Sequence, residues 1–461
     1  MAGSERLNFL WIFGEDLYPN LACYGTPVVQ TPNLDRLASQ GARHENAFVT
    51  CPVCSPSRSA IISGTYQTSF GAHQHRSKRD DPLPENVRLI TDHFRDAGYF
   101  TCNSPGPPFD RRGKTDFNFH VENPFDGKDW SERDEGQPFY AQCNLPDTHR
   151  DFRRDPDRPV NPDAVELPPY YPDHPLTRAD WAHYLESVQV VDRKVGVILD
   201  RLDDEGLAEN TVVFFISDHG RAHVRDKQFL YDGGIRVPLI VRWPGGVEPG
   251  AVRDDLVSGV DFAPTTLSLA GLAVPEHMEG QVFLGPDAVT RDEVIAARDR
   301  CDGTDDRIRA VRTHRHKYIR NYHPDRAYLQ FNAYKKLQYP VLTLMESLHA
   351  RGELTTEQAR FMAETRPAEE LYDLDVDPHE LHNLAERAEH APVLEDLSRR
   401  LERWIDETGD HGETPEDPAI AAYWDDHMAA NFAQAMGERG LATDIASDDY
   451  LRWWEEAYGT A

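Results

Sequence analysis

Short apolar runs alternate with helix-patterned segments along most of this 461-residue chain. Runs such as LNFLWIF and TVVFFIS have the nearly continuous apolar character of strands that are buried on both faces of a sheet. Between them, TPNLDRLASQG spaces its apolar residues as a helix does, with Thr31 in the N-cap position and Pro32 in the first turn. Because strands alternate with helices, the pattern predicts an α/β fold with a mostly parallel central sheet sandwiched by helices.

The alternation continues to about residue 305, and the pattern then changes. Further helices are predicted after CSPSR and in ITDHFRDAG and YLESVQVVDRKVGVILDRLDDEG, and further strands in PFYAQCNL, VPLIVRWPG and EVIAAR. Beyond this point, IRAVRTHRHKYIRNY predicts a short hairpin and LEDLSRRLERWIDETG an amphipathic helix. We therefore expect a main domain over residues 1–305 and a smaller C-terminal α+β subdomain over residues 306–461, with a small antiparallel sheet and helices. The segment from Pro146 to Pro175 is expected to be a surface loop near the site.

Charge and hydropathy limit the classes of partner. A formal net charge of −30 argues against nucleic acid or an anionic membrane, although a local pocket on an acidic protein can still be basic. No apolar run in the sequence reaches the roughly 18 residues that cross a bilayer. The segment MAGSERLNFLWIFGED lacks a basic stretch followed by a long apolar one, so we expect no secretory signal in it. The expected location is the cytoplasm, or the periplasm or the cell exterior if a leader has been removed.

Reactive side chains follow several of the predicted strands directly. In open α/β sheets, ligands bind beyond the carboxyl ends of the strands, so residues at those positions are candidates for a site. Three strand ends carry carboxylate or imidazole groups: Glu15 and Asp16, Asp147 and His149, and Asp218 and His219. Their recurrence at one expected sheet edge favours a functional site over isolated helix caps or solvated loops.

The six cysteines do not form a recognisable disulfide framework, because they are few and widely spaced. Cys51 and Cys54 in CPVCSPSRSAIISG have the spacing of a redox pair or of half a zinc site. A second such pair is absent from the sequence, which disfavours structural zinc. Pro56 and the polar residues around it are foreign to a thioredoxin-like motif. The interpretation that remains is a site that uses Cys54 together with Arg58.

The stretch Cys54-Ser55-Pro56-Ser57-Arg58 resembles the C-x-P-S-R signature of the type I, formylglycine-dependent sulfatases of the alkaline-phosphatase-like superfamily. Further segments resemble the same family in the expected order, over about residues 7 to 390: TPNLDRLASQG, GKTDFNF, SDHG, YDGGIRVPLIVRWPG, VDFAPTTLSLAG and ELYDLDVDPHELHNLA. The resemblance implies the superfamily's α/β fold, with the main domain as the catalytic one.

The resemblance also implies a specific nucleophile. In the family, a maturation enzyme oxidises the signature cysteine to Cα-formylglycine, and this implies modification of Cys54. The hydrated aldehyde is a gem-diol in which one hydroxyl attacks sulfur and the other later loses its proton and expels sulfate. Pro56 and Arg58 match what the maturation enzyme reads, and Arg58 is also expected to steady the diol. Cys51 is then a small buried residue.

Four of the strand-end residues are implied to hold one divalent cation beside residue 54: Glu15, Asp16, Asp218 and His219. Such an ion neutralises sulfate oxygens and acidifies the nucleophile's hydroxyl. Calcium is the ion that the family resemblance favours. Glu15 stands where the family commonly has Asp, and His219 stands where it frequently has Asn. Because a nitrogen ligand is softer than calcium prefers, manganese and magnesium remain possible.

Cationic and imidazole groups complete the implied site. Lys114 and Lys227 fall on the family's two lysine positions, which stabilise charge that develops on the sulfate oxygens. His149 matches the histidine that contacts the sulfate or donates a proton to the leaving oxygen. Asp116 stands where many relatives have a second histidine, so the group that assists deprotonation stays open.

The loop GAHQHRSKRD follows the signature helix and is rich in basic and imidazole groups. Such a loop suits a sugar that carries sulfate or carboxylate groups, and a solvated loop is the alternative. The expected substrate-binding residues are His73, His75 and Arg76 of this loop, together with Asp116.

Three functions are considered. The favoured one is a sulfatase that hydrolyses a sulfate ester or sulfamate, most readily of a sulfated carbohydrate. The first alternative is a phosphonate monoester or phosphodiester hydrolase of the same superfamily. The second is a non-catalytic, sulfatase-like glycan-binding protein whose cysteine is never matured. The expected partners are a sulfated small molecule or saccharide and the maturation enzyme; the sequence predicts no oligomeric state.

Overall fold

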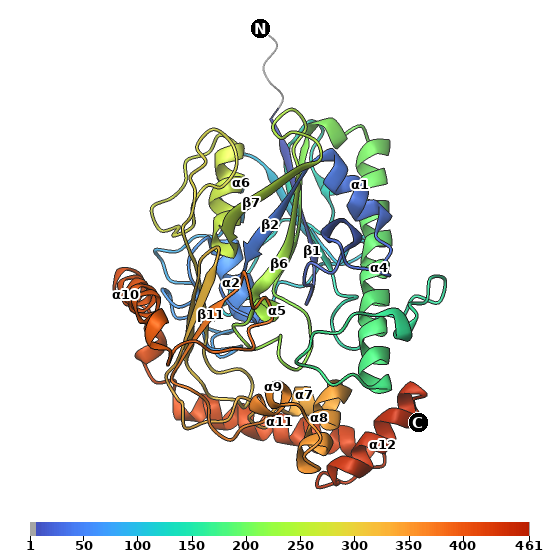
Figure 1. Ribbon diagram of the computed structural model, residues 1–461. Coiled ribbons are helices and arrows are strands. Elements are labelled where there is room, and N and C mark those ends of the chain that lie inside the picture. Colours follow the sequence, from blue (N-terminus) through green and yellow to red (C-terminus); the bar gives the residue numbers. More distant parts are fainter. Residues whose placement is uncertain (1–5, 461) are drawn as a thin grey trace.

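A seven-stranded sheet forms the centre of the protein, seen in a computed structural model that describes residues 6–460 (Figure 1). Residues 1–5, on which part of the expected N-terminal segment falls, and residue 461 lie outside the described part. The strand order is β3-β4-β1-β5-β6-β2-β7, and only the pairings of β6 with its two neighbours are antiparallel. The strands are β1 (Asn8–Gly14), β2 (Ala42–Phe48), β3 (Phe100–Ser104), β4 (Phe139–Leu145), β5 (Thr211–Ser217), β6 (Arg236–Arg242) and β7 (Ala251–Ser258). The predicted mostly parallel sheet is confirmed.

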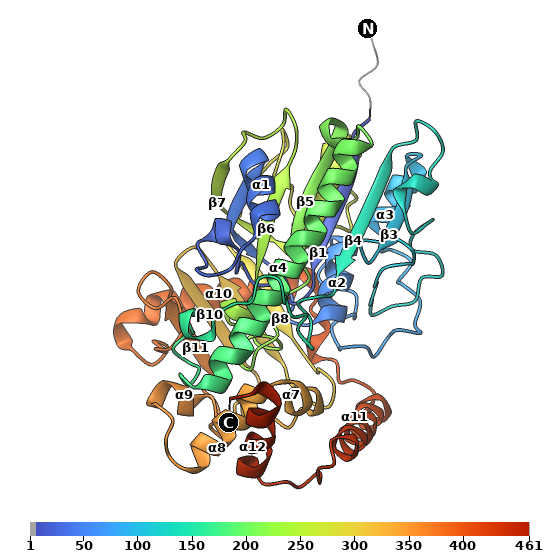
Figure 2. The same ribbon diagram turned by 90° about the vertical axis from the view of Figure 1, so that its right-hand side faces the viewer.

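Helices cover both faces of this sheet (Figures 1 and 2). On one face, α1 (Pro32–Gln40) packs against the long helix α4 (Pro175–Asp204). The opposite face carries α2, α3 and α6, which contact one another. The bounds of these and the short α5 are α2 (Cys54–Ser63), α3 (Ile90–Asp96), α5 (Asp232–Ile235) and α6 (Phe262–Leu269). The prediction of helices on both sides of the sheet is therefore confirmed.

The continuous apolar runs become the central strands because both of their faces are covered. Every residue of β1 is buried, and so is every residue of β4 and β5. Trp11 of β1 shows how the layers lock together: its ring contacts Tyr140 on the neighbouring strand, and its indole N–H donates to Thr266 of α6 at 3.2 Å. The sheet and its helices therefore share one core.

A second, antiparallel sheet in the order β11-β10-β9-β8 lies beside the first. Its strands are β8 (Val294–Arg298), β9 (Ile308–Arg312), β10 (His316–Asn321) and β11 (Glu369–Asp373). β9 and β10 are the predicted hairpin, and the predicted amphipathic helix is α10 (Ala391–Thr408), which packs on them. The strand predicted in EVIAAR is β8, so the small sheet takes an edge strand from ahead of residue 305. The domain boundary itself stays a prediction.

Helices gather at the end of the molecule that lies away from α1 (Figure 2). They are α7 (Ala333–Gln338), α8 (Pro340–Ala350), α9 (Thr356–Arg360), α11 (Pro418–Glu438) and α12 (Ser447–Tyr458). Both α8 and α12 contact α4, and α11 contacts α7. Short 3-10 helices span Ala22–Tyr24, Trp130–Glu132, Pro162–Ala164, Ala208–Asn210, Gly259–Asp261, Ala388–His390 and His411–Glu413. Among residues 6–460, no helix combines the length and the apolar character that a membrane span requires.

The start of α1 lies where the sequence predicts it, but a distant residue caps it. Thr31 occupies the N-cap position without capping; its hydroxyl accepts from the N–H of Ala22 at 2.9 Å. The first amides of the helix are held instead by Asp192 of α4, which accepts from the backbone N–H groups of Asn33 at 2.9 Å and Leu34 at 2.8 Å. This long-range cap fastens α1 to α4.

We expect Asp192→Ala to lower the free energy of unfolding by about 1–3 kcal/mol, because it leaves buried helix amides without acceptors. Asp200→Ala is a matched control on the same helix. It removes an exposed contact with Arg36 of α1, of a kind that contributes about 0–1 kcal/mol. Urea denaturation followed by tryptophan fluorescence measures both. Equal losses in the two variants would contradict the cap.

Candidate active site

Three neighbouring strands deliver the candidate residues to one place. In the sheet, Gly14 at the end of β1 pairs with Leu145 at the end of β4 and with Ser217 at the end of β5. The residues that follow these strands therefore emerge side by side, as the sequence predicts. Asp147 also follows one of these strands, but its carboxylate forms an ion pair with Lys194 of α4 at 2.6 Å.

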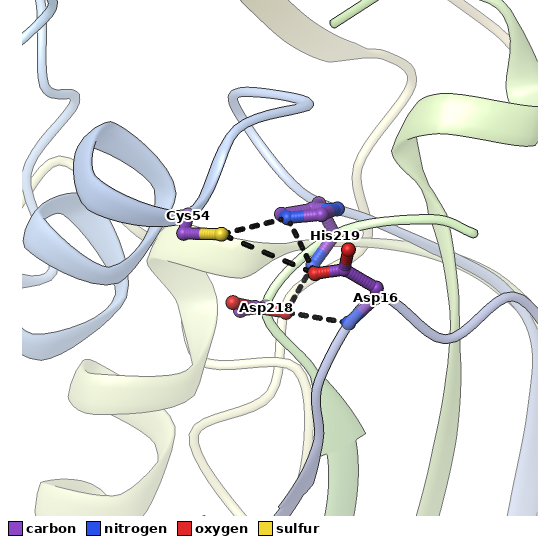
Figure 3. Close-up of side chains that lie close together, drawn as sticks. All are labelled: Asp16, Cys54, Asp218 and His219. Atoms are coloured by element: carbon purple, nitrogen blue, oxygen red, sulfur yellow. Dashed lines mark hydrogen bonds and ion pairs between the residues drawn. The ribbon is translucent and has the colours of Figure 1, made fainter. Parts of the chain in front are cut away.

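Four of the predicted residues form a compact buried cluster: the ligand atoms of Asp16, Cys54, Asp218 and His219 all lie within 4.8 Å of one another. Figure 3 shows the Cys54 thiol directed toward His219 and Asp16; its Sγ lies 3.2 Å from His219 Nε2 and 3.9 Å from Asp16 Oδ1. The same His219 nitrogen lies 3.1 Å from Asp16 Oδ1. Asp218 Oδ1 accepts from the backbone N–H of Asp16 at 3.0 Å, which joins the two strand ends.

Helix α2 brings Cys54 and Arg58 into this cluster. Cys54 is its first residue, so the positive end of the helix dipole lies beside the thiol. One turn later, the Arg58 guanidinium donates to Asp218 at 2.9 Å and to Asn144 on β4 at 2.6 Å. All ten residues of α2 are buried, which fixes the helix against the strand ends. The paired-thiol interpretation gains no support, because both Cys51 and Cys54 are free.

The two predicted lysines pair with the strand-end carboxylates. Lys227 Nζ lies 2.7 Å from Asp16 Oδ2 and 3.6 Å from Cys54 Sγ. Lys114 Nζ donates to Glu15 Oε2 at 3.1 Å. Both ammonium groups therefore flank the position of residue 54, as a sulfate-binding role requires.

Burial and charge act against each other on the titratable groups. Burial raises the pKa of the Asp16 carboxyl, but Lys227 and His219 outweigh it and hold the pKa well below its usual value. Burial lowers the pKa of His219, yet Asp16 and Asp218 raise it to about 10. For the Cys54 thiol, burial raises the pKa, and the neighbouring ammonium and imidazolium groups lower it further than burial raises it. Opposite charges thus stabilise each ionised group.

The donor set fits a divalent cation. Glu15, Asp16 and Asp218 offer the carboxylate oxygens that calcium and magnesium prefer, and His219 adds one nitrogen. Oε1 of Glu15 is buried and accepts no hydrogen bond from the residues described, although the Arg58 guanidinium lies 3.2 Å away. Binding of an ion would release the proton of His219, since a metal-ligating imidazole is neutral. Glu15 lies outside the compact cluster of four, so its place in the metal set stays a prediction.

Several residues near Cys54 have a strained backbone conformation. Asp16, Arg76, Gln228 and Asp302 all have positive φ angles, between 50° and 77°. This region costs non-glycine residues on the order of 1–3 kcal/mol each and persists where surrounding contacts enforce it, often at functional sites. The chain thus keeps these four side chains in place against its local preference.

A cavity of about 360 Å³ opens beside Cys54. Five of the predicted residues line it: Cys54, His75, Arg76, His149 and Lys227. The Nδ1 atom of His149 lies 2.6 Å from the carbonyl oxygen of Arg150, which fixes Nδ1–H as a donor and leaves Nε2 for a ligand. Nucleophile, cation and imidazole candidates therefore share one cavity.

Two predicted substrate-binding residues do not line this cavity. Asp116 pairs instead with Arg76 at 3.1 Å and lies 3.7 Å from Lys114, so it holds cationic side chains in place. His73 is buried, and burial lowers its pKa. Burial also lowers the pKa of His75, so the positive charge of this loop comes from its arginines and Lys78 and not from its imidazoles.

Sequence reasoning missed much of the cavity wall, including Asp302, Tyr334 and a face of α11 formed by Trp424, His427, Met428 and Asn431. The α11 residues have the i, i+3, i+4, i+7 spacing of one helix face, and only this spacing could have identified them from the sequence. The signal is weak, because the same spacing describes any packed or solvated helix face.

Lys335 of α7 fixes the loop that carries Lys227. Its buried Nζ donates to the backbone carbonyls of Val224 and Lys227, both at 2.9 Å. Burial lowers the pKa of Lys335 well below its usual value, which favours the neutral amine. A neutral amine has two N–H bonds, and these two carbonyls use both.

Comparison with known proteins places the chain in a family. The family model described as Sulfatase matches residues 7–118 and 126–272, more than half of the chain. A model described as N-sulphoglucosamine sulphohydrolase, C-terminal, matches residues 220–338. An ulvan-active sulfatase from Formosa agariphila is 34% identical over 91% of this chain and 78% of its own length. An N-acetylgalactosamine-6-sulfatase from Homo sapiens is 27% identical over 58% of this chain and 63% of its own length.

Solved structures share the fold. One, determined in complex with its substrate D-glucosamine-2-N,6-O-disulfate, has a TM-score of 0.65 at 17% identity and covers 89% of this chain and 100% of its own. A phosphonate monoester hydrolase from Agrobacterium radiobacter has a TM-score of 0.66 at 18% identity, with coverages of 87% and 96%. Taken with the sequence relatives, these findings show that the chain belongs to the sulfatase family and is a sulfuric ester hydrolase.

Proposed function

We propose that this protein hydrolyses a sulfate ester, or a sulfamate, of a sulfated carbohydrate, with Cys54 oxidised to formylglycine as its nucleophile. The observation that carries this proposal is the position of Cys54, which lines a cavity next to buried carboxylates and Lys227. Relatives named for their action on ulvan and on N-acetylgalactosamine 6-sulfate support a saccharide substrate.

A divalent cation, most readily Ca²⁺, completes the proposed site, with Mn²⁺ and Mg²⁺ as alternatives. Asp16, Asp218 and His219 would hold it, with Glu15 completing the set. When bound, the ion supplies positive charge to the sulfate oxygens and acidifies the nucleophile's hydroxyl. Maturation by a formylglycine-generating enzyme would supply the aldehyde hydrate at residue 54.

The remaining groups act through charge and proton transfer. Lys114 and Lys227 flank residue 54 and would stabilise the negative charge that grows on the sulfate oxygens as the ester bond breaks. His149 lines the cavity, and when its ring is protonated its Nε2–H would give a proton to the leaving oxygen. Arg58 neutralises Asp218 beneath the nucleophile and holds α2 in position.

The alternative function, phosphonate monoester hydrolysis, is supported by a similar fold. However, the chain resembles the phosphonate hydrolase structure and the disulfated-glucosamine complex equally well. The sequence relatives favour the sulfatase. Parallel assays with 4-nitrophenyl sulfate, a sulfated saccharide and a phenyl phosphonate monoester separate the two activities. We expect sulfate release to exceed phosphonate cleavage, and the reverse ranking would contradict the proposal.

Cys54→Ala should abolish sulfate release and leave thermal stability close to that of the wild type, because only the nucleophile is lost. Cys51→Ala is the matched control: its thiol is buried against Val53 and Cys301 and does not reach the cluster, so most activity should remain. Mass spectrometry of the wild-type peptide should also show formylglycine at residue 54. Equal losses of activity in the two variants would restore the paired-thiol interpretation.

Asp218→Asn should remove bound divalent cation together with activity, because a charged oxygen ligand becomes a neutral amide. Asp147→Asn is the control, since this carboxylate also follows a strand but pairs with Lys194. Elemental analysis of purified protein gives ions bound per chain. The assignment of the metal site would be wrong if Asp218→Asn retained a full complement.

Lys227→Ala should lower kcat by roughly two to three orders of magnitude, the usual cost of losing one preorganised donor to the transition state. Lys194→Ala, which removes a lysine outside the cavity, should leave kcat close to the wild-type value. Inorganic sulfate should raise the melting temperature of the wild type by mass action and do so less in Lys227→Ala. Near-normal turnover in Lys227→Ala would show that another group stabilises the sulfate.

A further inference from the structure

We propose that the cavity face of α11, together with the His75–Asp302 pair, is a subsite for the sugar ring that carries the sulfate, and that His75 recognises a free hydroxyl of that ring. This inference rests on the proposed sulfatase function and adds to it the residues that recognise the carbohydrate. The cavity brings these groups and Cys54 around one space, although α11 lies more than 350 residues along the chain from Cys54.

The α11 face combines the residue types that bind sugars. Trp424, His427, Met428 and Asn431 follow one another along the helix on the side that meets the cavity. His427 and Asn431 are hydrogen-bonded to each other at 3.0 Å, between Nε2 and Nδ2. The face therefore offers an aromatic ring and an apolar thioether beside an imidazole and an amide, which suits a ring with C–H and O–H groups.

Trp424 is held in a defined orientation. Its ring meets the ring of His427 edge-on at 5.6 Å and 89°, and the guanidinium of Arg300 lies 5.9 Å from its centroid. Arg300 is itself fixed by an ion pair with Glu416, just ahead of α11. A ring held in this way presents a flat apolar surface at little entropic cost, as a platform for the C–H face of a pyranose must.

His75 supplies the polar contact. Its Nδ1 lies 3.1 Å from Asp302 Oδ1, so the carboxylate accepts from Nδ1–H and sets the tautomer. Nε2 is buried and has no hydrogen-bond partner among residues 6–460. Burial lowers the pKa of His75, although Asp302 opposes the shift, so the imidazole is neutral at neutral pH. Its free nitrogen is then a hydrogen-bond acceptor.

An acceptor at this place selects against a second sulfate. A sugar hydroxyl can donate to Nε2, whereas a sulfate group has only acceptor oxygens and would leave the nitrogen unpaired. The same cavity also holds a cationic group, Lys227, beside Cys54. The cavity therefore matches a ligand that places its sulfate near Lys227 and Cys54 and its free hydroxyls near His75 and α11. Arg76 and Arg79 also line the cavity, and both are paired with Asp116. Its volume of about 360 Å³ lies at the lower end of the roughly 300–1,000 Å³ usual for small-ligand sites.

The test compares Trp424→Ala with Phe331→Ala, which removes an exposed aromatic that packs on Phe432 of α11 and does not line the cavity. The probes are ulvan oligosaccharides and N-acetylgalactosamine 6-sulfate as substrates, and inorganic sulfate as an inhibitor that has the anionic group but no sugar ring. We expect Trp424→Ala to raise KM for the better saccharide about tenfold, as loss of a binding tryptophan does, and to leave the inhibition constant of sulfate unchanged. Phe331→Ala should change neither value.

A second variant tests the hydroxyl contact. His75→Asn keeps a donor near Asp302 and removes the acceptor at Nε2, so KM for the saccharide should rise about tenfold while sulfate inhibition again stays the same. Wild-type KM in both Trp424→Ala and His75→Asn would overturn the subsite, and so would an equal weakening of sulfate inhibition, which would indicate collapse of the cavity. If the wild type cleaved 4-nitrophenyl sulfate but no saccharide, the proposed carbohydrate substrate would fail, and the subsite with it.

Discussion

Compensation of buried charge is the constraint on which the architecture of this site depends. Asp16 and Asp218 lie at the ends of adjacent central strands, where neither side chain reaches solvent. A buried carboxylate without a partner costs several kcal/mol, so each must meet a cation. Lys227 and Arg58 meet this need from a loop and from a helix that are distant in sequence. The positions of α2 and of the loop after β5 are thus tied to the strand ends.

The same constraint explains what the sequence could predict. Continuous apolar runs identify strands that are covered on both faces, and a reactive residue directly after such a strand must lie at the sheet edge. The convergence of Asp16, Asp218, His219 and Cys54 followed from these local signals and the family resemblance. Local pattern and global fold agree here, as they do in sequences that fold to one structure.

Features that depend on contacts between distant parts of the chain could not be predicted from the sequence. The run VPLIVRWPG looks like any buried strand, and only its neighbours decide that β6 runs antiparallel. Thr31 stands at a helix start, yet a carboxylate from α4 takes over the capping because the two helices pack together. The spacing of the α11 face does not distinguish it from any other helix face in the sequence. Its meaning comes from the cavity that it meets, which is built from segments far away in the chain.

The hold of Lys335 on the loop of Lys227 has an evolutionary consequence. Both of its acceptors are main-chain carbonyls, which every residue type provides. The side chain at position 224 can therefore vary among relatives without loss of the contact, whereas a shorter side chain at position 335 would release both carbonyls at once. Within this contact, selection should act on the anchoring helix more strongly than on the anchored loop.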